Sequence, residues 1–202
     1  MFKRLLHLPF IVLALYACGS GATLRVGEPA PAFEGMDTGG NVHRLADYRG
    51  KTVVLEWTNH DCPYVRKHYG AGNMQAQQRE AAAQDVIWLS VISSAPGKQG
   101  HVSPAEADEL TRNRNAAPHA VILDSEGTIG QAYEARTTPH MFIIDGAGKL
   151  VYMGGIDSIT TANPDDIPGA TQHIRVALQE IAAGKPVSTP VTKPYGCSVK
   201  YR

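Results

Sequence analysis

The chain has 202 residues, of which 43% are hydrophobic, and its 19 basic and 19 acidic side chains give a formal net charge of zero. This length and composition predict one modest globular domain, or at most two. A net charge of zero implies no broad basic field, so nucleic acid is not expected as a partner. No apolar run of membrane-spanning length follows the N-terminal region, which argues against a protein that crosses a bilayer repeatedly.

Residues 1–22 are typical of a bacterial export signal. A positively charged start and a short apolar core precede several small residues, and these permit cleavage after Ala22. The segment Leu15-Tyr16-Ala17-Cys18 resembles a lipobox instead, in which Cys18 would be lipidated and become the first residue of the mature protein. Tyr16 is larger than the residue usual at its position, so both outcomes stay open. We expect an exported protein of the bacterial periplasm or cell envelope, with membrane contact only through a lipid on Cys18.

The first predicted strand of the domain, residues 51–57, leads into a polar loop that ends in Cys62. Pro63 suits the first position of a helix, where its missing N–H costs nothing. The first turn of a helix offers unpaired N–H groups and a partial positive charge, and both favour a thiolate. The loop therefore predicts a reactive cysteine assisted by His60, although a buried structural cysteine stays open. Trp57 is expected in the core.

The rest of the chain predicts alternating helices and strands. In chain order these are a helix from 63, interrupted at 70–72 and continued over 74–84, a strand over 86–92, a helix over 103–112, a strand over 120–123, a hairpin over 141–144 and 149–154, and a final helix over 170–184. Residues 163–169 are a loop with no assigned role. We therefore expect one α/β domain over 23–184, with helices on both faces of its sheet, and a proline-rich extended tail over 185–202.

Thr138 and Pro139 stand immediately before a predicted central strand, where proline is unusual unless its peptide bond is cis. A strand, Cys62-Pro63 and a helix, followed later by Thr138-Pro139 and a strand, resemble the thioredoxin fold. Residues 26–33 are similar to the G-x-x-A-P-x-F opening of its redoxin branch. That branch contains the alkyl hydroperoxide reductase/thiol-specific antioxidant proteins and the periplasmic thioredoxin-like thiol-disulfide oxidoreductases. The resemblance covers about 26–156 and implies a central mixed sheet, with the cis-proline loop presenting its backbone beside Cys62.

The end of the tail carries a further cysteine, Cys197. Its surroundings resemble the G-C-S-[IV]-K ending of a bacterial thioredoxin-like group whose active loop reads C-P-[YF]-V, as residues 62–65 do here. If Cys18 is removed or lipidated, two cysteines remain in an oxidising compartment. A proline-rich segment of twelve residues reaches roughly 35–40 Å, so Cys197 can return to Cys62. A structural disulfide and a free Cys197 stay open.

The active loop departs from two familiar patterns. Val65 stands where a C-x-x-C motif has its second cysteine. The peroxiredoxin pattern P-x-x-x-T-x-x-C would need proline and threonine where Leu55 and Asn59 stand, and Pro139 falls about where its arginine is expected. The charge of Arg66 or Arg136 could substitute for that arginine.

The resemblance implies that Cys62 attacks a protein or small-molecule disulfide, or a peroxide. Cys197 then resolves the product, and an external thiol reductant opens the resulting disulfide. We favour disulfide exchange over thiol peroxidase activity, because the residues that orient peroxide are the missing ones. No cofactor and no bound metal are expected for this chemistry.

A different class of function is also considered. His60, Cys62, His68 and His140 could approach one another, and imidazole with thiolate suits copper or zinc. The alternative is therefore a copper- or zinc-binding metallochaperone of the cell envelope with a thioredoxin fold. A binding module that has lost turnover is a third possibility, against which the retained cysteine–proline and threonine–proline pairs count.

Overall fold

The computed structural model describes residues 23–202, so the predicted export signal and Cys18 lie outside the described residues. The elements in chain order are β1 (Glu34–Met36), β2 (Val42–Arg44), η1 (Leu45–Tyr48), β3 (Val53–Trp57), α1 (Pro63–Gly70), α2 (Asn73–Ala82), β4 (Ile87–Ile92), α3 (Pro104–Asn113), β5 (Ala120–Leu123), α4 (Thr128–Ala132), β6 (Thr137–Thr138), β7 (His140–Ile144), β8 (Leu150–Gly154), η2 (Pro164–Gly169), α5 (His173–Ala182) and β9 (Cys197–Ser198).

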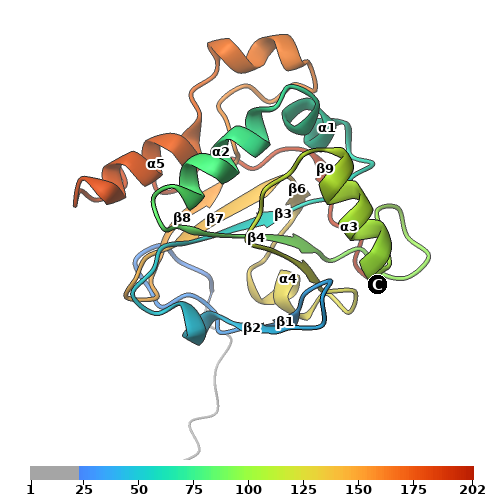
Figure 1. The fold of residues 1–202 in the computed structure, drawn as a ribbon. Coiled ribbons are helices and arrows are strands. Elements are labelled where there is room, and N and C mark those ends of the chain that lie inside the picture. Colours follow the sequence, from blue (N-terminus) through green and yellow to red (C-terminus); the bar gives the residue numbers. More distant parts are fainter. Residues whose placement is uncertain (1–22) are drawn as a thin grey trace, which may run out of the picture.

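A five-stranded mixed sheet forms the centre of the molecule, with strand order β5-β4-β3-β7-β8 (Figure 1). The pairs β3–β4 and β4–β5 are parallel, whereas β3–β7 and β7–β8 are antiparallel. Strand β3 is the middle strand, and Trp57 at its end lies opposite Val91 on one side and His140 on the other. The loop after Trp57, which carries Cys62, therefore leaves from the middle of the sheet.

Apolar side chains pack on both faces of this sheet. On one face, α1, α2 and α5 cover a core that includes Val54, Trp88 and Tyr152. On the other, η1 and α4 close over a core that includes Leu55 and Phe142. Figure 1 shows these helices on opposite sides of the sheet. The mixed sheet with helices on both faces confirms the predicted fold class, and Trp57 is fully buried as expected.

Several helical segments differ from the prediction. Residues 163–169, expected as a loop, contain η2, and η1 was not predicted. The final helix begins at His173, not at 170, because η2 contains Pro168 and Ala170 already has extended backbone. Helix α4 was not predicted, since it is only five residues long and follows a turn-like sequence. The carboxylate of Asp124 accepts from the backbone N–H groups of Ile129 and Gly130 at 3.1 and 2.8 Å, and so supports this short helix.

The tail after α5 returns across the domain in two steps. Its first part, residues 190–192 (the strap), runs beside β8, where Met153 donates to the Pro190 carbonyl and Thr192 donates to the Met153 carbonyl. Thr192 Oγ1 also accepts from the backbone N–H of Gly155 at 2.9 Å. The second part forms β9, which pairs antiparallel with β6. The proline-rich tail is therefore held along the domain.

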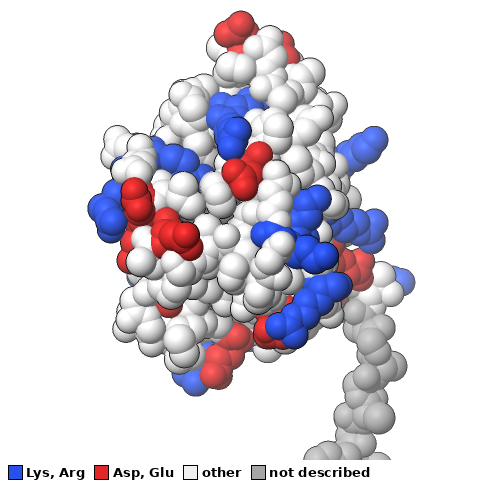
Figure 2. Space-filling model, turned by 90° about the vertical axis from the view of Figure 1, so that its right-hand side faces the viewer, with Lys and Arg blue, Asp and Glu red and all other residues white. Residues whose placement is uncertain are grey.

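The surface carries charges of both signs. Figure 2 shows basic and acidic side chains scattered over one face, with uncharged surface between them, as the net charge of zero suggests. Among residues 23–202, no helix has the length and apolarity needed to cross a bilayer.

Phe142 tests the packing of the central core. It is fully buried, with the rings of Trp57 and Tyr133 at centroid distances of 5.1 and 5.5 Å. We expect Phe142→Ala to lower the free energy of unfolding by about 3–5 kcal/mol, because it leaves a cavity among these rings. Denaturant unfolding measures this change. Met36→Ala is the control, since Met36 is 55% exposed, and a change of more than about 0.5 kcal/mol there would show that the assay is not reporting burial.

Candidate active site

The loop between β3 and α1 places Cys62 at the N-cap of α1, with Pro63 as the first helical residue. Asn59 shapes this loop: its side-chain oxygen accepts from the N–H of Asp61 at 2.9 Å, and its carbonyl accepts from the N–H of Cys62 at 3.0 Å. The carbonyl of Cys62 then begins the helix by accepting from Arg66 N–H at 2.9 Å. The predicted position of the cysteine at a helix start is confirmed.

The sulfur of Cys62 lies beneath two other segments. The Thr138–Pro139 peptide bond is cis, as predicted, and the carbonyl of Thr138 accepts from the Cys62 thiol at 2.9 Å. From the tail, the backbone N–H of Cys197 points to the same sulfur, with an N–S distance of 3.4 Å. The side chain of Cys62 has no exposed surface, whereas Cys197 is partly exposed. Residues far apart in the sequence therefore meet at one sulfur atom.

Gly196 makes the close approach of the tail possible. Its φ of +135° is unfavourable for other residues, and a Cβ atom there would lie 2.0 Å from the carbonyl oxygen of Thr138. In β9, Cys197 pairs with Thr138 and Ser198 pairs with Thr137. The next residue, Val199, donates its N–H to the carbonyl of Arg136 at 3.0 Å. The tail thus lies directly on the proline loop, and both cysteines are free thiols in this structure.

The pKa values of the two thiols are shifted in opposite directions. Burial acts to raise the pKa of Cys62, but hydrogen bonds from the side chains of Cys197 and Thr138 and from the backbone of Cys197 and Val65 outweigh it and leave this pKa lowered. Burial, followed by the hydrogen bond and the charge of Cys62, raises the pKa of Cys197 to about 11. Cys62 is therefore the thiol that ionises first, which suits a nucleophile.

A buried polar cluster lies behind α1. Lys67 and Asp157 form an ion pair at 3.1 Å with both side chains fully buried, and Lys67 Nζ also donates to the carbonyl of Ile159 at 2.9 Å. The hydroxyl of Tyr195 donates to Asp157 Oδ1 and lies 3.1 Å from His68 Nε2. Burial, the largest influence, lowers the pKa of His68 to about 4, so this imidazole is neutral at neutral pH. Tyr195 precedes Cys197 by two residues, so the cluster joins α1 to the tail.

A second buried carboxylate, Glu56, lies in β3. It accepts hydrogen bonds from Tyr69 at 2.9 Å, Gln78 at 3.2 Å, Trp88 at 2.8 Å and Ser90 at 3.0 Å. These donors come from α1, α2 and β4, so one carboxylate ties three elements to the strand that leads to the active loop. A charged residue inside an otherwise apolar strand is the signal in the sequence for this group.

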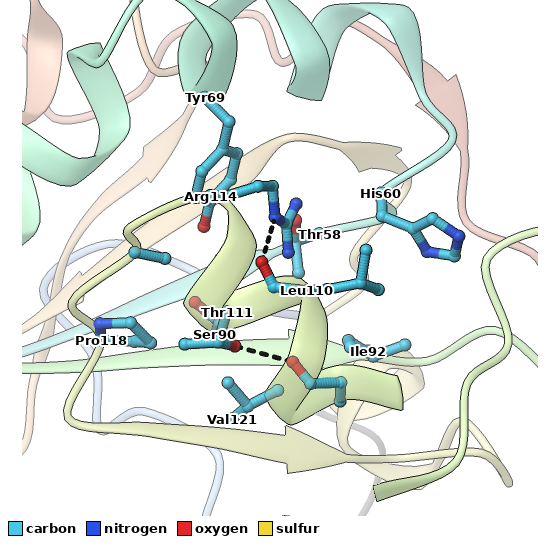
Figure 3. Close-up of a pocket in the computed structure, with 12 residues that line it drawn as sticks. Thr58, His60, Tyr69, Ser90, Ile92, Leu110, Thr111, Arg114, Pro118 and Val121 are labelled. Atoms are coloured by element: carbon cyan, nitrogen blue, oxygen red, sulfur yellow. Dashed lines mark hydrogen bonds between the residues drawn. The ribbon is translucent and has the colours of Figure 1, made fainter. Parts of the chain in front are cut away.

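A narrow cleft lies beside the loop that precedes Cys62 (Figure 3). Thr58 and His60 line it from the loop, and Leu110 of α3 and Arg114, the C-cap of α3, line it from the other side. The Arg114 guanidinium lies 4.2 Å from the centre of the Tyr69 ring. Its volume of about 10 Å³ is about the space that one water molecule needs. The cleft is therefore too small for an organic substrate.

The other predicted residues are dispersed around the site. His60 Nε2 lies 3.5 Å from Asp61 Oδ2. Arg66 also pairs with Asp61, at 3.1 Å, and Arg136 pairs with Glu134 at 3.2 Å; both arginine side chains are largely exposed. The donors that lower the pKa of Cys62 come from the tail, the proline loop and the start of α1.

The structure does not bring together the histidines and the cysteine that were considered as an alternative metal site. His68 is engaged with Tyr195 and Asn73 on the α1 side of the sheet. His140 packs on Phe142, with 4.3 Å between ring centres, and its Nδ1 accepts from the N–H of Arg136. Within residues 23–202, no three histidine, cysteine, aspartate or glutamate side chains are arranged to hold a metal ion. The alternation of side chains along β7 and the burial of α1 separate the histidines.

The fold and the site define a thioredoxin-like protein with one cysteine at a helix start and a second cysteine in a returning tail. The family model for the AhpC/TSA family matches residues 26–153, and the chain belongs to this family. This result confirms the redoxin resemblance predicted from residues 26–33 and the two proline motifs.

Individual relatives agree with this assignment. The chain is 26% identical over 132 residues to the thiol-disulfide oxidoreductase ResA of Geobacillus kaustophilus, and the match covers 62% of this chain and 66% of that protein. An uncharacterized conserved protein from the same species has a similar structure, with a TM-score of 0.76 and 25% identity over 89% of this chain and 94% of that one. An exposed lipoprotein thioredoxin from Streptococcus pneumoniae gives a TM-score of 0.51 and 27% identity, covering 69% of this chain and 96% of that one.

The acidity of Cys62 can be tested by a thiolate titration at 240 nm. We expect Cys62 to ionise below its ordinary pKa of 9.0 and Cys197 to ionise near 11. Cys197→Ala should raise the pKa of Cys62, because it removes the side-chain donor that favours the thiolate. Cys197→Ser, which keeps a donor, is the matched control and should raise it less. Equal values in the wild type and in Cys197→Ala would contradict this account of the thiolate.

Proposed function

We propose that this protein is a thiol-disulfide oxidoreductase in which Cys62 and Cys197 form the redox pair. The observation that carries the proposal is the position of Cys197 on β9, where its N–H lies 3.4 Å from Cys62 Sγ. A second cysteine held at this distance takes the place of the one missing from the active loop, where Val65 stands. The relatives named thiol-disulfide oxidoreductases support the same class of reaction.

The proposed reaction begins at the Cys62 thiolate. It attacks one sulfur of a substrate disulfide, a mixed disulfide forms, and the other substrate sulfur leaves as a thiolate. Cys197 loses its proton and attacks Cys62 Sγ, and the substrate sulfur that was bound to Cys62 leaves as a thiolate and takes up a proton. The substrate gains two electrons and the protein becomes the Cys62–Cys197 disulfide. An external thiol reductant returns the two electrons. Thr138 and Pro139 position the partner sulfur through their backbone.

One observation favours a hydroperoxide as a second candidate substrate. Cys62 has no exposed surface beneath the tail, and a small oxidant needs less room than a protein disulfide. Attack on a hydroperoxide would give a sulfenic acid and release water or an alcohol. Cys197 would then displace the sulfenic oxygen, which leaves as water. Disulfide exchange is nevertheless preferred, because Asn59 and Pro139 stand where the peroxide-orienting residues are expected.

The proposed setting is the bacterial cell envelope. The proposal rests on the signal-like residues 1–22, with cleavage after Ala22 or lipidation of Cys18. The similarity to an exposed pneumococcal lipoprotein thioredoxin supports it. An oxidising compartment would also suit a cycle that ends in a disulfide. Protein or small-molecule disulfides are the proposed substrates, with no cofactor required.

Two substitutions separate the roles of the cysteines. Cys62→Ser should abolish turnover, because it removes the nucleophile. Cys197→Ser should retain the first step and accumulate a mixed disulfide or a sulfenic acid at Cys62. Peptide mass spectrometry after one equivalent of a peptide disulfide, or of hydrogen peroxide, identifies each product over time.

The wild type is the reference in this experiment. Faster Cys62–Cys197 closure with the peptide disulfide supports disulfide exchange, and faster closure with peroxide supports the peroxidase. If Cys197→Ser turns over normally and only lowers the melting temperature, Cys197 has a structural role and the proposed pair is incorrect.

A further inference from the structure

We infer that Tyr195 is a positioning residue that holds Cys197 at Cys62 and controls access to the buried sulfur. This inference rests on the proposed function, since it assigns a residue that governs closure of the Cys62–Cys197 pair. Tyr195 lies in the tail, two residues before Cys197, and is itself buried. Its contacts lead to α1, the helix that has Cys62 as its N-cap.

The side chain of Tyr195 is held from several directions. Its hydroxyl donates to Asp157 and lies 3.1 Å from His68 Nε2. The Lys67 ammonium lies 5.5 Å from the centre of its ring, and the ring of Tyr64 lies 5.8 Å away. Asp157 is fixed in turn by the buried ion pair with Lys67. A hydrogen bond to a charged group inside the protein is stronger than one between neutral groups.

The backbone transmits this position to Cys197. Gly196 follows Tyr195 and lies so close to the Thr138 carbonyl that no side chain fits there. Cys197 then pairs with Thr138, and its N–H reaches Cys62 Sγ. One end of the Tyr195–Cys197 segment is therefore fixed to α1 through Asp157, and the other end is fixed to the proline loop.

This arrangement has opposite effects on two rates: the reaction between Cys62 and Cys197, and the reaction of Cys62 with external reagents. While Tyr195 is held, Cys197 stays close to Cys62, which raises the rate of their reaction. The same contact keeps the tail over Cys62, which restricts external reagents because the sulfur has no exposed surface. Loosening Tyr195 should therefore slow the internal reaction and speed the external one. General destabilisation does not predict this pair of changes in a fully folded sample.

Tyr195→Phe tests the inference in the full domain, because it removes the hydroxyl and keeps the ring. After one equivalent of a peptide disulfide, we expect the Cys62–Cys197 disulfide to form from the mixed disulfide about tenfold more slowly than in the wild type, as loss of one such hydrogen bond implies. In the reduced protein, alkylation of Cys62 by a bulky maleimide should become several-fold faster, because the same lost hydrogen bond loosens the tail over the sulfur. Peptide mass spectrometry measures the rate of this alkylation.

Tyr133→Phe is the matched control. It also removes a hydroxyl from a buried tyrosine, and this hydroxyl donates to the Pro31 carbonyl at 2.7 Å, not to a residue of the tail. It should leave both rates close to those of the wild type, although both variants lower the melting temperature. Gly196→Ala is a second variant, which should shift both rates in the same directions as Tyr195→Phe by displacing the tail from Thr138.

The outcomes distinguish the inference from the proposed function. If the wild type never forms the Cys62–Cys197 disulfide, the proposed function fails, while faster alkylation of Tyr195→Phe would still show control of access. If the wild type closes and Tyr195→Phe closes equally fast, the positioning role is refuted and the redox pair stands. Parallel changes in Tyr195→Phe and Tyr133→Phe would also refute it, because they would reflect stability alone.

Discussion

The pairing of β9 with β6 is the contact on which the site depends. Without it, Cys62 would be a lone thiol at a helix start, as its local sequence suggests. Cys197 supplies a backbone N–H to the Cys62 sulfur and a side chain within reach of it. The glycine before it is what permits the backbone to lie on the Thr138 carbonyl. A single backbone approach thus sets the acidity, the burial and the proposed partner of the nucleophile.

The buried residues Glu56, Lys67 and Asp157 each have hydrogen-bonding partners. Glu56 receives four hydrogen bonds, and the Lys67–Asp157 pair is completed by Ile159 and Tyr195. Isolated buried charges are strongly destabilising, whereas charges with complete hydrogen bonding can be accommodated and fix a specific geometry. Here the two groups fix α1 from both sides: Glu56 joins it to the sheet, and Asp157 joins it to the tail.

The local sequence was sufficient to predict the helix that follows Cys62 and the cis-proline loop. The Cys62-Pro63 pair marks a helix start because of properties of those two residues, and Pro139 marks a cis loop for the same kind of reason. The family resemblance supplied the fold that relates the two motifs. The proline-rich tail is long enough for Cys197 to reach Cys62, but its length alone does not determine which part of the domain Cys197 contacts.

The remaining features depend on contacts between distant residues. Tyr195 and His68 are 127 positions apart, and neither carries a local signal of the other. The histidines suggested a metal site because sequence spacing does not show which face of the sheet each would occupy. Helix α4 depends on the side chain of Asp124, which on its own resembles an ordinary turn residue.

The strap has a consequence that is separate from sulfur chemistry. Strand β8 is the last strand of the five-stranded sheet, and an uncovered edge strand can pair with another chain and start aggregation. The strap residues occupy the backbone groups of Met153 on that edge. They also precede Tyr195, so the strap would stay paired if residues 195–202 moved. The sheet would then remain guarded against edge-to-edge association while the cysteines change partners.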